Sequence, residues 1–109
     1  MGQPGLEAFG RFSEPALLIL ISLADGPKHG YAIQDDIEGL ARVRPGPGTL
    51  YGALARLERQ GFVEPLPSVD RRQPYRLTDN GATALRSQLA ELHQLTATGL
   101  ERLQAGVPA

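Results

Sequence analysis

The sequence predicts a mainly α-helical (α+β) protein: a winged helix-turn-helix with a two-stranded β wing, followed by a long C-terminal dimerisation helix. Three observations support this expectation. One apolar segment and three segments with apolar residues at helical spacing indicate helices, two short β-prone segments flank an exposed tip, and arginine concentrates around the third helix and that tip. We expect residues 1–78 to form the winged helix-turn-helix, with a lead-in over 1–12, and residues 79–109 to form the dimerisation helix and a short tail.

The first third of the chain holds two expected helices. Residues 13–15 (Ser-Glu-Pro) are typical of a helix start with the serine as N-cap, and Gly26-Pro27 ends this helix after about Asp25. Its leucines and isoleucines cover nearly the whole circumference, so we expect burial on several sides, partly by a second subunit. A second, short helix should run from His29 to about Leu40.

A turn and a third helix follow. Residues 43–48 contain two prolines and two glycines, which helix and strand interiors tolerate poorly, so the chain should turn there. From Thr49, three leucines at helical spacing point inward while Tyr51 lies on the outer face, and Gly61 ends this helix.

A short ribbon is expected next. Residues 62–66 and 73–77 are β-prone and interrupted by proline, which favours a two-stranded edge ribbon over a central sheet. Residues 67–72 then form its exposed tip.

The last helix begins at a capping signal over residues 78–81 and should reach Gln104. Leucine, threonine and glycine follow one another along it at spacings of three and four, a heptad-like seam. This apolar stripe is too long to be covered by the rest of so small a chain. We therefore predict that a second copy covers it in a homodimer. The expected interface residues are Leu17, Leu85, Leu89, Leu92 and Leu103.

Charge is unevenly distributed along the chain. The formal net charge is −1, whereas proteins that bind the phosphates of nucleic acids are usually basic. However, residues 40–76 carry seven arginines against three acidic residues, whereas residues 1–39 carry two basic and six acidic residues. The middle third is therefore basic, and its positive charge is all arginine, which pairs bidentately with phosphate and guanine.

Several classes of function are disfavoured. The chain has no cysteine, which excludes disulfides and thiolate zinc sites, and His29 and His93 lie on different expected helices without further ligands, so we expect no metal or other cofactor. The glycines before Thr49 lack the lysine of a phosphate-binding loop, and we expect no catalytic residues and no enzyme. The apolar stretch 16–24 is far shorter than the ~20 residues that cross a bilayer, so we expect no membrane association and a cytoplasmic location.

Three stretches together resemble the signature of PadR-type transcriptional regulators. They are His29–Ile33, Gly48–Leu54 continuing to Leu57–Val63, and Tyr75–Gly81, within a resemblance that covers roughly residues 14–85. The resemblance implies a transcription factor, usually a repressor, that binds a palindromic operator in double-stranded DNA as a dimer and releases it on a signal. Members often carry a larger C-terminal helical domain, whereas here one long helix remains, as in a short-tailed branch.

Transferred by position, the resemblance places the start of the recognition helix at Gly48, Thr49 and Tyr51 and the wing tip at Arg71 and Arg72. A helix N-terminus offers free N–H groups to phosphate, and arginines at an exposed tip can enter a minor groove or contact a phosphate. Tyr51 could instead be a surface aromatic, and the two arginines a solvated turn.

Further candidates are less specific. Tyr31 either closes the second helix on the first or donates its hydroxyl to a phosphate. Arg44, like Arg42, either contacts phosphate or faces solvent, and the same alternatives hold for Arg56 and Arg59, which have no acidic partner three or four positions away.

The simplest interpretation is a regulator that binds DNA and no small molecule, and two alternatives to it remain open. A winged helix can serve as a protein-protein adaptor or dimerisation module, although an arginine-rich reading surface favours DNA. A DNA-binding dimer could also hold a small-molecule effector at its interface, lined by residues such as Leu89 and Leu92.

Overall fold

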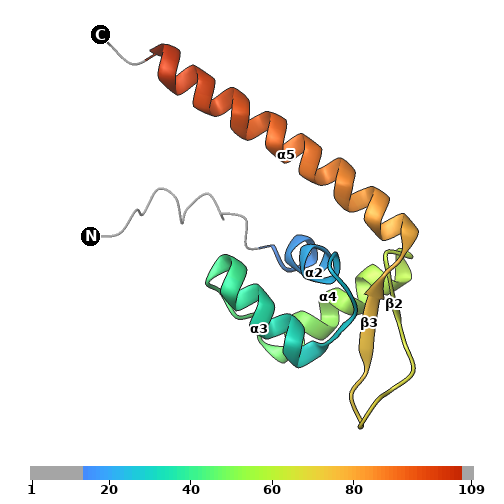
Figure 1. The fold of residues 1–109 in the computed structure, drawn as a ribbon. Coiled ribbons are helices and arrows are strands. Elements are labelled where there is room, and N and C mark those ends of the chain that lie inside the picture. The colour runs from blue at the N-terminus through green and yellow to red at the C-terminus, as the bar shows by residue number, and fades with distance from the viewer. Residues whose placement is uncertain (1–13, 107–109) are drawn as a thin grey trace.

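The structure, a computed structural model, describes residues 14–106, so the expected lead-in 1–12, the N-cap Ser13 and the tail 107–109 lie outside it. Four helices and three short strands occur in the described part, and Figure 1 shows their arrangement. In chain order they are α2 Pro15–Leu23, β1 Lys28–His29, α3 Gly30–Ala41, α4 Pro47–Arg59, β2 Val63–Pro65, β3 Pro74–Leu77 and α5 Asp79–Gly106.

The core lies where α2, α3 and α4 meet. Helix α2 is apolar on all sides, and Ile19 is fully buried at its centre together with Ile33 of α3 and Leu50 of α4. The first β-strand of the wing and the first turns of α5 close the core with Val63 and Leu85. The first helix is therefore buried on several sides, as predicted, and residues of its own chain provide most of that burial.

Several helix boundaries differ from the predicted ones by one or two residues, and the starts of α2 and α4 bear on the site. Helix α2 has Glu14 at its N-cap position, one residue after the predicted cap at Ser13, and Glu14 makes no side-chain cap hydrogen bond. Helix α4 begins at Pro47 with Gly46 as N-cap, two residues before the predicted start at Thr49. Proline fits the first helical position because the N–H it lacks would have no partner there.

The sheet has three strands in the order β1-β3-β2, all antiparallel. The predicted two-stranded ribbon is present as β2 and β3, with Glu64 opposite Arg76. The short strand β1 was not predicted. It adds to the other edge of β3, where Lys28 faces Tyr75, and so ties the start of α3 to the wing.

The wing ends in a tight turn. Val69 and Arg72 form an isolated antiparallel bridge, and between them Asp70 and Arg71 both have positive φ angles, 51° and 66°. Two successive left-handed residues are the geometry of a type I′ hairpin turn. The turn therefore holds Arg71 at the far end of the ribbon.

Helix α5 is joined to the body only at its first turns. The Thr78 hydroxyl donates to the carbonyl of Gly61 at 2.6 Å and accepts from the N–H of Gly81 at 3.0 Å, which bears out the predicted capping signal. Gly81 lies so close to Phe62 that a Cβ atom there would overlap the Phe62 carbonyl. The remainder of the 28-residue helix extends away from the body, and the described chain measures 60 × 33 × 20 Å (Figure 1).

Candidate nucleic-acid interface

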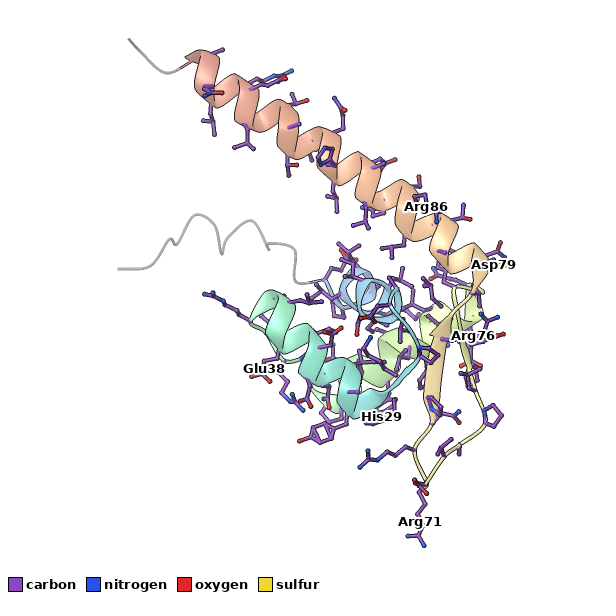
Figure 2. The ribbon with its side chains drawn as sticks, in the orientation of Figure 1. His29, Glu38, Arg71, Arg76, Asp79 and Arg86 are labelled. Carbon is purple, nitrogen blue, oxygen red and sulfur yellow. The ribbon has the colours of Figure 1, made fainter. Side chains whose placement is uncertain are left out.

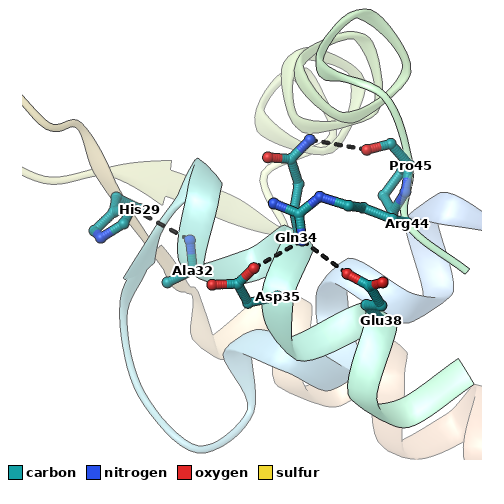
Figure 3. A network of polar contacts seen from close by, with 7 residues as sticks. All are labelled: His29, Ala32, Gln34, Asp35, Glu38, Arg44 and Pro45. Atoms are coloured by element: carbon teal, nitrogen blue, oxygen red, sulfur yellow. Dashed lines mark hydrogen bonds and ion pairs between the residues drawn. The ribbon is translucent and has the colours of Figure 1, made fainter. Parts of the chain in front are cut away.

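The N-terminal end of α4 is open to solvent. Residues 46–49 are all exposed, and the turn that precedes them is held by a hydrogen bond from Gln34 Nε2 to the carbonyl of Pro45 at 2.8 Å (Figure 3). The first hydrogen bond of the helix ends at Gly46, so the N–H groups of Gly48 and Thr49 precede it and have no intrahelical acceptor. This end combines free donors with the positive end of the helix dipole, a combination suited to an anion.

Tyr51 links α4 to α3. Its side chain is 48% exposed, yet its hydroxyl occupies the position that a side chain on Gly30 would take, so it lies against the first residue of α3. The charge of Tyr51 also contributes, after burial, to raising the pKa of Tyr75 on β3 above its ordinary value. Tyr51 therefore reaches from the exposed face of α4 to the junction of α3 and the sheet.

Arg44 is held by acidic residues of α3. Its Nη1 lies 2.7 Å from Asp35 Oδ1 and 3.0 Å from Glu38 Oε1 (Figure 3), and these hydrogen bonds, the one to Asp35 first, raise the pKa of the guanidinium. Two carboxylates offset its single positive charge. Arg44 is thus less suited to phosphate than its position in the sequence indicated.

Tyr31 stands on the surface. Its side chain is 60% exposed, and the guanidinium of Arg44 lies 5.1 Å from the centroid of its ring, within the range of a cation–π interaction. The alternative that Tyr31 closes the second helix on the first is therefore wrong. Its hydroxyl stays available as a donor.

The wing arginines differ in their surroundings. Figure 2 shows Arg71 pointing away from the body at the end of the ribbon, where it is exposed. Arg72 reaches back toward α3, and its Nη1 lies 3.2 Å from Nε2 of His29. Arg76, at the base of the ribbon, forms an ion pair with Glu64 across the strands.

The basic surface is consequently smaller than the sequence indicated. Of the seven arginines in residues 40–76, Arg44 and Arg76 pair with carboxylates. The other five make no ion pair with any residue between 14 and 106: Arg42, Arg56, Arg59, Arg71 and Arg72.

Sequence reasoning missed the contacts of two residues at this interface, although it expected the second helix to start at His29. His29 caps α3 by accepting from the N–H of Ala32 through Nδ1 at 3.3 Å (Figure 3), and its other nitrogen faces Arg72. Gly30 provides the space for Tyr51. Their signal was the His-Gly-Tyr stretch, which sequence reasoning used for the family resemblance, for the start of the second helix at His29 and for the candidate Tyr31.

The expected dimer residues lie in different environments. Leu85 is only 4% exposed and packs in the core of its own chain, so it has little surface left for a partner. Leu17 and Leu92 are half-buried, whereas Leu89 and Leu103 are 40% and 69% exposed. A groove of about 250 Å³ runs between α2, α4 and α5, and Leu17 lines it. The apolar surface available to a partner therefore begins at Leu89.

Residues 14–106 contain neither a metal-ion site nor a membrane-spanning helix. No group of three or more His, Cys, Asp or Glu side chains there could hold a metal ion. No helix in this part of the chain is long and apolar enough to cross a membrane.

Three helices around a buried core, a ribbon beside the third of them and an exposed N-terminus on that third helix together define a winged helix-turn-helix protein. Residues 19–87 match the family model described as the transcriptional regulator PadR-like family. The chain belongs to this family, whose members are transcriptional regulators that bind DNA and are not enzymes.

Solved structures share the fold. A transcriptional regulator from Clostridium thermocellum is 26% identical with a TM-score of 0.68, over 94% of this chain and 96% of that one. A PadR family transcription regulator from Clostridium difficile R20291 is 23% identical with a TM-score of 0.74, over 82% of this chain and 97% of that one.

A curated relative is more similar in sequence. A 37.1 kDa protein of transposon TN4556 from Streptomyces fradiae is 44% identical over 86 residues, which is 79% of this chain. The match spans only 25% of that relative's length.

Proposed function

We propose that this protein is a transcriptional repressor that binds an inverted-repeat operator in double-stranded DNA as a homodimer. The observation that supports it best is the pairing of an open α4 N-terminus with a wing that ends in Arg71 and Arg72. In a winged helix these are the two parts that meet a major groove and the adjacent backbone or minor groove. Gly48 and Thr49 supply donors, while Arg71 and Arg72 supply charge.

Tyr51 and Tyr31 complete this surface as hydroxyl donors beside the α4 N-terminus. Tyr51 belongs to α4, the proposed recognition helix, and Tyr31 directly follows Gly30, the residue of α3 that Tyr51 contacts. Arg44 acts mainly by fixing the turn before α4 on α3 through Asp35 and Glu38. Besides this positioning residue, Arg44, the residues proposed to contact DNA are Gly48, Thr49, Tyr51, Arg71, Arg72 and Tyr31.

The homodimer is proposed to form through α5. At 1.5 Å per residue this helix is about 42 Å long, and most of its leucines beyond the first two turns are exposed. Pairing two such helices would bury Leu89, Leu92 and Leu103, with Leu17 at the edge. Residues 1–78 would then act as the DNA-binding unit and residues 79–109 as the dimerisation unit.

Release from DNA is proposed to follow binding of a small apolar effector between the two subunits. The half-buried Leu17 beside the groove between α2, α4 and α5, and the exposed Leu89, would line such a site. Occupancy would change the angle between the two DNA-binding units.

Selection of bound duplexes from a random DNA library at two salt concentrations tests the proposal. We expect an enriched inverted repeat with half-sites about one helical turn apart. Recovery of one half-site alone would contradict the dimeric reading, and no enrichment at either salt concentration would favour the protein-adaptor alternative. Transcription in vitro from a promoter that carries the selected repeat should fall as protein is added, and a rise would identify an activator.

A further inference from the structure

A hollow of about 510 Å³ opens between the wing and the start of α3. His29 and Lys28 line it from β1, while Asp70 and Arg72 line it from the wing tip. It lies outside the N-terminus of α4, and the function proposed above uses only Arg72 of these four residues. Its chemistry depends on what its polar groups can still bind.

The ring of His29 makes two contacts that cannot both be accepting ones. Nδ1 accepts the N–H of Ala32 and so needs a free lone pair, which in a neutral imidazole places the proton on Nε2. Nε2 is therefore a donor, and it faces Nη1 of Arg72, which is also a donor, at 3.2 Å. Two donors converge with no acceptor between them.

The neighbouring charges do not supply that acceptor. The ammonium of Lys28 is itself a donor, and it binds the carbonyl of Ser22 and the carboxylates of Asp25 and Asp36. Asp70 lines the same hollow, but it forms neither an ion pair nor a hydrogen bond with Arg72 or His29 among the described residues. The positive end of α3 also points here, because His29 is its N-cap.

We propose that His29 and Arg72 together bind one oxygen of a DNA backbone phosphate in this hollow. The inference rests on the proposed DNA-binding function and adds a second anchor to it, on the wing side of the reading helix. An anionic oxygen between Nε2–H and the guanidinium satisfies both donors and keeps the Nδ1 cap on α3. Because a phosphate carries no sequence information, this pair fixes position and leaves base choice to α4.

The test is a double-mutant cycle with His29→Asn and Arg72→Gln. Asparagine retains the capping oxygen for the N–H of Ala32 but is too short to reach the hollow. We expect His29→Asn to weaken binding roughly tenfold for both the selected duplex and a scrambled duplex of equal length, with an unchanged melting temperature. Arg72→Gln should weaken both and reduce the salt slope by about one unit.

The control is Arg71→Gln at the same turn. Because His29 and Arg72 share one oxygen, the double variant should lose less binding free energy than the two single variants lose together. The losses for His29→Asn and Arg71→Gln should be additive. Additive effects for the first pair, or a His29→Asn variant that binds within twofold of the unmodified protein, would overturn the proposal. Failure of the unmodified protein to bind either duplex would instead overturn the DNA-binding function.

The tautomer of His29 provides a test without any variant. Nitrogen-15 shifts of the unmodified protein should show the proton on Nε2, and the Nε2 signal should move on addition of the duplex. A proton on Nδ1 in the free protein would overturn the proposal, because Nε2 would then accept from Arg72. A response to inorganic phosphate but not to duplex would overturn it in favour of a small-anion site.

Discussion

The hydroxyl of Tyr51 fills the space in which a side chain at position 30 would lie. Helix α4 and the start of α3 are therefore in contact through the ring of Tyr51, which fits only because Gly30 has no Cβ atom. A change at Gly30 is therefore transmitted directly to Tyr51, an exposed residue of the surface proposed to bind DNA.

Gly30→Ala should displace the ring of Tyr51. We expect a loss of about 1 kcal/mol in the free energy of unfolding, because the added methyl overpacks the contact. DNA affinity should also fall. Gly39→Ala on the same helix is the control: its Cβ meets open space, so it should gain roughly 0.5–1 kcal/mol. Denaturant unfolding measures both, and equal gains for the two variants would show that Tyr51 does not rest on Gly30.

Replacing both Arg71 and Arg72 by alanine should weaken DNA binding and lower the salt slope by about two units, one for each lost phosphate contact. The melting temperature should stay unchanged, since neither residue forms an ion pair within residues 14–106. Arg86→Ala is the control, because Figure 2 places Arg86 on α5, away from the wing. Binding isotherms at several salt concentrations measure the slope, and an unaltered slope would remove the wing from the interface.

Leu89→Glu should convert the proposed dimer to monomers. A charge buried in an apolar seam is costly, whereas on a monomer Leu89 is 40% exposed and tolerates the change. Ser87→Glu adds the same charge to an exposed position two residues earlier and should leave the dimer intact. Light scattering of both variants decides the matter, and a dimeric Leu89→Glu protein would place the interface elsewhere.

Ser22→Ala should stabilise the protein by about 1 kcal/mol. The Ser22 hydroxyl is buried in α2 and finds no hydrogen-bond partner among the described residues, so its removal relieves a desolvation cost. Ser68→Ala in the exposed wing loop is the control and should change little. Thermal unfolding gives the comparison. A loss of stability in Ser22→Ala would mean that the hydroxyl is satisfied, by bound water or otherwise.

Stability should fall at alkaline pH partly through Tyr75. Burial, and secondly the charges of Tyr51 and Glu58, raise its pKa above the usual 10.0. A folded-state pKa above the unfolded value means that the native state holds the proton more tightly. The resulting stabilisation is complete below pH 10 and is lost as the pH rises through the folded-state pKa. Tyr75→Phe should flatten this fall, whereas Tyr31→Phe should not. Urea unfolding from pH 8 to 11 measures both.

Local patterns were enough to predict the order of the elements. The heptad spacing, the capping Thr78 and the proline-bounded ribbon depend on neighbours in the chain, and the structure confirms the winged-helix fold. The two-residue strand β1 escaped prediction because it is too short to show periodicity and exists only through its pairing with Tyr75 and Pro74.

Contacts between distant residues account for the other differences. Arg44 appeared free because its partners Asp35 and Glu38 lie on the preceding helix, where the turn after α3 brings them together. Leu85 fits the heptad seam as well as Leu89 does, and only the folded body shows that it is already covered. The facing donors of His29 and Arg72 are 43 residues apart in sequence.

The narrow attachment of α5 has a mechanical consequence. The helix meets the body at Thr78, Gly81 and Leu85 and then extends as a rigid rod. A tilt of about 10° at this root swings the far end of a rod about 42 Å long by roughly 7 Å. In a dimer joined along its two α5 helices, the angle between α5 and the body sets the distance between the two DNA-binding units. Half-site spacing is then specified by residues that never touch DNA.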